Sequence, residues 1–176
     1  MDSQPAFDGI RTPKAPYFVN DKNGLYKAKK PLTAEQIIDF AKILLADRFK
    51  PGQPFDNPYV VREWLRLEYQ DLEHEIFACL FLDNGNCLIA HEILFRGTIG
   101  AASVYPREVA KRALQLNAAA VIFAHNHPSG KPEPSNADRM ITDKLQQCLS
   151  LLDIKTLDHL IVAKQGTCSF AEHGWV

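Results

Sequence analysis

Two histidines and one aspartate have the spacing that most directly indicates chemistry. His125 and His127 follow an unbroken apolar run, and Asp138 lies eleven residues beyond His127, where a helix is expected to begin. Side chains at positions i and i+2 of an extended chain point to the same side, so both imidazoles can reach one ion. Two imidazoles and one carboxylate leave a fourth position open on a tetrahedral zinc. This is the ligand set of a catalytic zinc whose coordination a water molecule completes.

Each of these residues also has a purely structural explanation. A histidine at the end of a strand is more often a surface or core residue than a ligand. The pattern Ser135-x-x-Asp138 is typical of a capping box at a helix N-terminus. Capping and metal binding are compatible, because a cap fixes the helix end that presents Asp138. The pair of histidines, rather than either one alone, therefore carries the zinc prediction.

The elements on either side of this stretch are expected to position its side chains. Residues 119–124 form a continuous apolar run, the pattern of a central strand buried on both faces. Three prolines and a glycine in residues 125–135 predict a loop. Apolar residues then recur at helical spacing over residues 135–152. A helix that packs back beside the strand would bring Asp138 to the two histidines.

Further strands and helices are predicted on both sides of this unit. Their order predicts an α/β layered domain over residues 56–176. Residues 1–55 are interpreted as an N-terminal tail plus helix. The predicted strands cover residues 76–82, 87–95, 98–104, 157–163 and 168–171, and the predicted helices cover residues 33–49, 57–71 and 106–117.

Composition excludes several classes of protein. With 20 Lys+Arg against 21 Asp+Glu, the formal net charge of −1 argues against a chain built around phosphate neutralisation. The longest apolar runs have seven residues, whereas a membrane-spanning helix needs about 20, so no membrane segment is predicted. Four cysteines without CxxC spacing favour a reducing, cytoplasmic setting. The lysines of residues 22–30 are interpreted as part of a solvated tail.

The spacing His-x-His-Pro followed by Ser-x-x-Asp resembles the JAMM metalloprotease motif of JAB/MPN domains. Other segments narrow the resemblance to the bacterial RadC family, and together they span about residues 69–176. The segments are residues 125–130 (HNHPSG), 106–108 (PRE), 94–98 (LFRGT), 158–159 (DH) and 169–170 (SF).

This resemblance implies an MPN (JAB) fold, a mixed β-sheet flanked by helices with cytidine-deaminase-like layering. It also implies that His125, His127 and Asp138 bind Zn²⁺ and that the Ser135 hydroxyl helps to stabilise a tetrahedral intermediate. A glutamate at the start of the first core strand would be the general base. Glu75 directly precedes that strand, and Glu73 is the alternative if the strand begins early.

The implied activity is that of a zinc metallopeptidase, in which a zinc-bound water hydrolyses a peptide or isopeptide bond of a protein or peptide substrate. Two alternatives stay open. One is a DNA-repair-associated or nuclease-like protein, although residues 1–55 lack the helix-hairpin-helix pattern of longer family members, so nucleic-acid binding is weakly supported. The other is a non-catalytic MPN interaction module. His159 is expected to have a structural hydrogen-bonding role near the site, and no oligomeric state is predicted.

Overall fold

The computed structural model describes residues 17–20, 25–52, 54–55, 57–97 and 104–176. The chain divides into two compact units, Met1–Asp47 and Arg48–Val176. Among the described residues, no helix combines the length and the apolar character that crossing a bilayer requires.

The first unit holds a short antiparallel sheet and a helix. Strands β1 (Phe18–Asn20) and β2 (Tyr26–Ala28) pair with each other, and α1 (Ala34–Arg48) follows. The sequence predicts the helix but not the strands. Phe18 stacks on Phe40 of the helix, and Tyr26 meets the same ring edge-on. These tertiary contacts, rather than any local periodicity, therefore account for the two strands.

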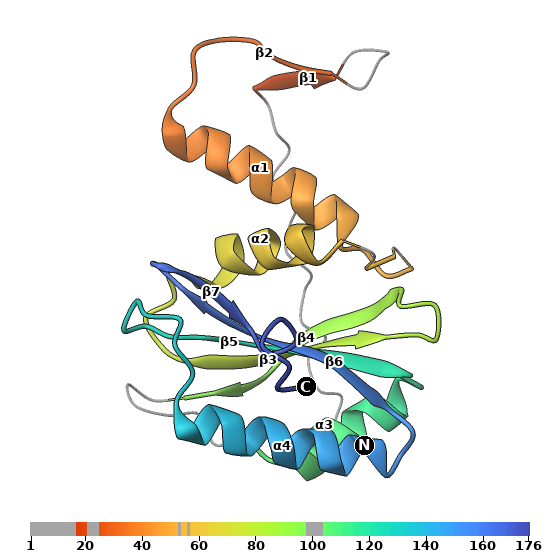
Figure 1. The fold of residues 1–176 in the computed structure, drawn as a ribbon. Coiled ribbons are helices and arrows are strands. Elements are labelled where there is room, and N and C mark those ends of the chain that lie inside the picture. Colours follow the sequence, from red (N-terminus) through yellow and green to blue (C-terminus); the bar gives the residue numbers. More distant parts are fainter. Residues whose placement is uncertain (1–16, 21–24, 53, 56, 98–103) are drawn as a thin grey trace, which may run out of the picture. The chain divides into compact units, whose positions relative to one another are not determined.

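The second unit is a five-stranded mixed sheet with helices on both faces (Figure 1). The strand order is β4-β3-β5-β6-β7, in which β5 and β6 are parallel and all other neighbours are antiparallel. Helix α2 covers one face, and α3 and α4 cover the other (Figure 1). The elements are α2 (Pro58–Tyr69), β3 (Ile76–Leu82), β4 (Leu88–Arg96), α3 (Pro106–Gln115), β5 (Ala120–Asn126), α4 (Asn136–Ser150), β6 (Lys155–Ala163) and β7 (Gly166–Ser169). The predicted mixed α/β fold with a sheet flanked by helices is confirmed.

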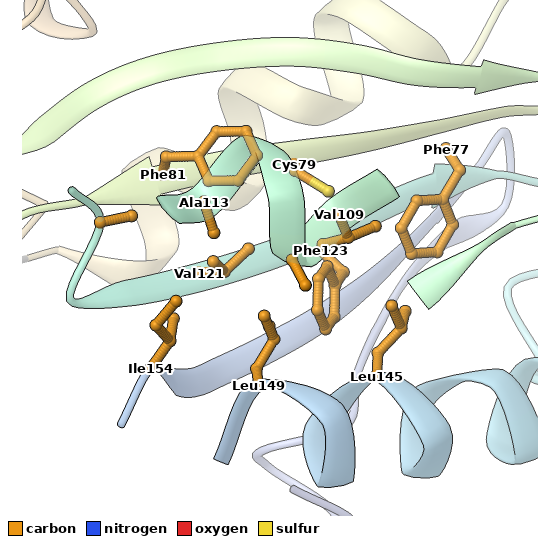
Figure 2. Packing of buried hydrophobic residues seen from close by; sticks show 12 residues of the cluster. Phe77, Cys79, Phe81, Val109, Ala113, Val121, Phe123, Leu145, Leu149 and Ile154 are labelled. Carbon is orange, nitrogen blue, oxygen red and sulfur yellow. The ribbon is translucent and has the colours of Figure 1, made fainter. Parts of the chain in front are cut away.

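The main hydrophobic core lies between the sheet and helices α3 and α4. Figure 2 shows apolar side chains of β3 and β5 meeting those of the two helices. The strand residues are Phe77, Cys79, Phe81, Val121 and Phe123, and the helix residues are Val109, Ala113, Leu145 and Leu149. Because alternate residues of a strand share one face, His125 continues the row that Val121 and Phe123 begin. It therefore faces α4 as well.

One predicted boundary near the histidines is wrong. The loop was expected to begin at His125, but β5 continues through Asn126, and His125 pairs with Phe77 of β3 and Ile161 of β6. His125 is 2% exposed and Asn126 is 1% exposed. Strand pairing keeps both polar residues in β5, since His125 pairs with strands on both sides and Asn126 pairs with Val162 of β6. Hydrophobicity alone does not reveal this pairing. Residues 98–103 of the strand predicted over 98–104 lie outside the described residues.

Candidate metal centre

His125, His127 and Asp138 converge at the end of β5. One ligand atom from each side chain lies within 4.8 Å of the others. The Nε2 atoms of His125 and His127 are 2.9 Å apart. Asp138 places Oδ1 3.4 Å from Nε2 of His125 and Oδ2 3.5 Å from Nε2 of His127. The structure thus brings together the three side chains that the sequence analysis proposed as zinc ligands.

The position of Asp138 is fixed by the start of α4. Ser135 is the N-cap, and its hydroxyl accepts a hydrogen bond from the Asp138 N–H at 3.1 Å. In return, Asp138 Oδ2 accepts hydrogen bonds from the Ser135 N–H and hydroxyl, both at 2.7 Å. The capping box expected from the sequence is therefore present. It holds the carboxylate at the helix end that faces the histidines.

The loop after β5 fixes His127. Its N–H donates to Val162 O of β6 at 2.8 Å, and the Gly130 N–H closes a turn by donating to His127 O at 3.0 Å. Gly130 has φ of +87°, a conformation that favours glycine. Nδ1 of His127 lies 2.9 Å from Lys131 O. Because a carbonyl oxygen only accepts, Nδ1 carries the hydrogen, and a neutral His127 has its lone pair on Nε2, toward the site.

A buried chain of hydrogen bonds gives His125 the same orientation. The Thr142 hydroxyl donates to Asp138 O at 2.6 Å, so its oxygen accepts from Nδ1–H of His159, also at 2.6 Å. Nε2 of His159 is then an acceptor, and it receives the hydrogen of Nδ1 of His125 at 2.7 Å. The lone pair of His125 Nε2 consequently points into the site. His159 has the structural hydrogen-bonding role that the sequence analysis expected.

The donor set fits a cation. Two imidazole nitrogens whose lone pairs face each other at 2.9 Å repel unless a proton or a metal ion lies between them. The adjacent carboxylate adds negative charge to the same point. Two neutral imidazoles, each fixed by a hydrogen bond from its other nitrogen, and one carboxylate are the ligands and supporting contacts that zinc sites use.

The pKa values of His125 and Asp138 are perturbed in directions that suit metal binding, whereas that of His127 is perturbed in the opposite direction. Burial lowers the pKa of His125 to about 4 and lowers that of His159 well below its usual value. Burial would raise the pKa of Asp138, but hydrogen bonds from His127 and Ser135 hold it below its usual value. At neutral pH, His125 is therefore neutral and Asp138 is ionised, as ligands must be. The pKa of His127 is raised, mainly by its hydrogen bond with Asp138, so a metal must displace a proton there.

An open cavity adjoins the three residues, with a volume of about 620 Å³. Glu75 lines it and is half-buried, whereas Glu73 is exposed and is not among the lining residues. The charge of Glu75 contributes to the raised pKa of His127, after the larger effect of Asp138. Ser135 also lines the cavity. Apolar side chains form another part of its wall, and they include Phe77, Val104 and Ile141.

Sequence reasoning did not identify Thr142 or the contacts of Asn126. Thr142 lies one helical turn after Asp138, on the same side of α4, and this spacing was the available signal. No pattern in the sequence indicates that Thr142 meets a histidine of β6. Asn126 stands between the two histidines, but its side chain bonds to Ile76, the first residue of β3, and to His74 just before that strand.

Comparisons with known proteins agree with the fold. A family model described as RadC-like JAB domain matches residues 55–175. A UPF0758 protein of Vibrio cholerae is 55% identical over 141 residues, which are 80% of this chain and 89% of that protein. UPF0758 protein YkfG of Escherichia coli K12 is 58% identical over 125 residues, 71% of this chain and 79% of its own length. A UPF0758 protein of Leptothrix cholodnii is 49% identical over 151 residues, which are 86% of this chain and 68% of that protein. These names state no activity.

Proposed function

Because the chain belongs to the family of RadC-like JAB domains, we propose that it is a zinc-dependent hydrolase of the JAMM type that cleaves a peptide or isopeptide bond. The observation that carries this proposal is the convergence of the His125 and His127 Nε2 atoms beside the Asp138 carboxylate, at the edge of an open cavity. JAB domains include metalloproteases, and this chain keeps the motif residues on which that activity depends.

The zinc would be held by His125, His127 and Asp138, with water at the open position. A zinc ion bound in this way lowers the pKa of its water toward about 7 and polarises a substrate carbonyl. Glu75 lines the same cavity, and in this proposal its carboxylate accepts the proton of the attacking water. The same carboxyl group then passes the proton to the leaving amine.

Ser135 would donate a hydrogen bond to the oxygen on which negative charge develops. In the structure its hydroxyl donates to Asp138 Oδ2, but the Ser135 N–H donates to that same oxygen. The backbone donor can therefore hold the carboxylate while the hydroxyl rotates toward the substrate. Loss of one such donor typically costs about 10²–10³ in rate.

The shape and lining of the cavity support a protein or peptide substrate. The cavity is open, and it combines the polar residues of the site with an apolar wall that includes Phe77, Val104 and Ile141. An extended peptide could place its scissile bond at the metal and an apolar side chain against this wall. A nuclease reading has no comparable support, since the net charge is −1 and phosphate backbones are bound by clustered Lys and Arg.

Metal content is the first test of the proposal. Purified wild-type protein should contain about one zinc per chain, and His127→Ala should contain almost none while keeping its fold, because one of three protein ligands is lost. Equal zinc in the two proteins would refute the ligand assignment. Absence of zinc from the wild type under zinc-replete conditions would favour the non-catalytic interaction module.

Hydrolysis is the second test, with a library of peptides and isopeptides as substrates. Glu75→Gln should lose about 10²–10⁴ in rate, the usual contribution of a general base, and should retain zinc. Glu73→Gln is the matched control and should be nearly neutral, since Glu73 is exposed and does not line the cavity. An inactive Glu73→Gln beside an active Glu75→Gln would reverse the assignment.

A further inference from the structure

The side chain of Asn126 bonds only to the segment that carries Glu75, among the contacts of the described residues. Oδ1 of Asn126 accepts the Ile76 N–H at 2.8 Å. Nδ2 of Asn126 donates to His74 O at 3.2 Å and, more weakly, to Leu72 O at 3.4 Å. The two shorter bonds reach the residues immediately before and after Glu75. We propose that Asn126 is a positioning residue that holds Glu75 in place for proton transfer, an inference that rests on the proposed function.

The position of Asn126 in β5 explains how it reaches this segment. Successive side chains of a strand point to opposite faces, so Asn126 points away from the face that His125 shares with α4. Helix α2 covers that opposite face (Figure 1), and the chain leaves α2 at Tyr69 and runs through residues 70–75 to β3. One short stretch of β5 thus supplies a metal ligand to one face and the anchor of Glu75 to the other.

Glu75 needs such an anchor because the β3–β5 ladder does not include it. The pairing of β3 with β5 begins at Phe77, opposite His125, while the backbone of Asn126 pairs with Val162 of β6. On the other side, Gly97 N–H donates to Glu75 O at 2.8 Å. The Asn126 side chain thus takes the place of the missing ladder bonds. With it, the peptide groups on both sides of Glu75 are fixed.

The residue type fits this role. An amide offers an acceptor and a donor on one short side chain, and Asn126 uses the acceptor for Ile76 and the donor for His74. An ionised aspartate cannot donate to a carbonyl, and an alanine leaves buried polar groups without partners. A displacement of about 1 Å at a catalytic group can cost about 10² in rate, so loosening this segment should affect proton transfer.

Kinetics of Asn126→Ala, alone and combined with Glu75→Gln, test the proposal. Asn126→Ala should keep about one zinc per chain, since Asn126 bonds to none of the three ligand side chains. Its kcat should fall by about 10² with little change in KM. In the Glu75→Gln background the same change should cost less than about twofold, because residues that act through one group are not additive. An equal loss in both backgrounds would show a merely structural role and overturn the proposal.

Amide hydrogen exchange provides a readout that does not depend on activity. In zinc-loaded Asn126→Ala, the Ile76 amide should exchange faster while the amide of Leu80, in the middle of β3, stays protected. Unchanged protection of Ile76 would refute the anchor whether or not a substrate is found. If the wild type hydrolyses nothing in the library, the proposed function fails while this measurement still decides the anchor.

Two further variants distinguish the loss of the anchor from a general loss of stability. If Asn126→Ala folds poorly, Asn126→Ser takes its place in these measurements. Serine keeps a polar group but is too short to reach Ile76 and His74 together, so the same kinetic pattern is expected. Asn57→Ala is the matched control. Asn57 also accepts two backbone hydrogen bonds, from Tyr59 and Val60, but it lies at the start of α2. This control should lose about 1 kcal/mol of stability with kcat unchanged.

Discussion

Strand β5 and helix α4 meet at two places that have opposite character. At one end, Val121 and Phe123 pack against Leu145 and Leu149, and all four side chains are fully buried. At the other end, His125 meets Asp138 and the Thr142–His159 pair. Both ends use the same row of alternate strand residues and one side of the helix. A single strand–helix contact thus forms core at one end and the candidate metal centre at the other.

The difference shows that apolar and polar contacts have separate roles in this structure. Hydrophobic packing is non-directional, and its free energy scales with the buried apolar area. The large buried area at the apolar end therefore fixes the separation of strand and helix. Hydrogen bonds and metal ligation need defined directions, and a single hydrogen bond adds little net stability. The polar end therefore depends on a spacing that the apolar end maintains. Substitutions at the two ends should have separable effects.

The largest effect is expected at the apolar end. Leu149→Ala removes a fully buried side chain of α4, and such changes lower the free energy of unfolding by about 2–5 kcal/mol. Zinc per folded chain should stay at about one, because no ligand changes. Denaturant titration and metal analysis measure both quantities.

The control for that variant lies on the same segment of chain. Leu151 is 86% exposed, and Leu151→Ala should change the free energy of unfolding by less than about 0.5 kcal/mol. A loss of zinc from folded Leu149→Ala would show that the two ends are not separable.

The next effect is that of zinc on stability. A ligand that binds only the folded state at 100 times its Kd adds about 2.7 kcal/mol to the free energy of unfolding. We expect this increment in the wild type and also in Leu149→Ala, because the polar end is intact in both. In His127→Ala the increment should disappear. Thermal or denaturant unfolding with and without zinc measures it, and an increment that survives in His127→Ala would contradict the ligand set.

The smallest effect is expected from the hydrogen bonds behind the site. Thr142→Val keeps the side-chain volume but removes the oxygen that accepts from His159, so His159 no longer fixes the hydrogen on Nδ1 of His125. Loss of such a supporting contact typically costs about 10–100-fold in metal affinity. Competition with a zinc chelator measures the change.

Thr156→Val is the control for this substitution. Thr156 lies on β6, and its hydroxyl is buried without a hydrogen-bond partner among the described residues. Its removal should leave zinc affinity unchanged and should not lower stability. Equal zinc affinities of the two valine variants would mean that the chain from Thr142 to His125 does not orient the ligand.

The sequence predicted most of the elements, because regular spacing of apolar residues reflects local conformation. The run over residues 76–82 is β3 without change, and helices α1 to α4 lie within about two residues of the predicted ranges. The His-x-His pattern beside the capping box of Ser135 also predicted which side chains meet, since the relevant faces follow from strand and helix periodicity. The C-terminal end of β5 was predicted two residues too early, because two polar residues close an apolar strand.

Other features depended on the tertiary structure. Strands β1 and β2 rest on ring contacts with Phe40, a residue outside their own segment. The sequence left both Glu75 and Glu73 open, and the register of β3 puts Glu75 at the cavity; its role as general base stays a prediction. The side-chain partners of Asn126 likewise lie 50 or more positions away along the chain, and His159, which bonds to the Thr142 hydroxyl, lies 17 positions from Thr142. Periodicity determines which side chains share a face of one element, whereas register and packing between elements decide which atoms come within hydrogen-bond distance.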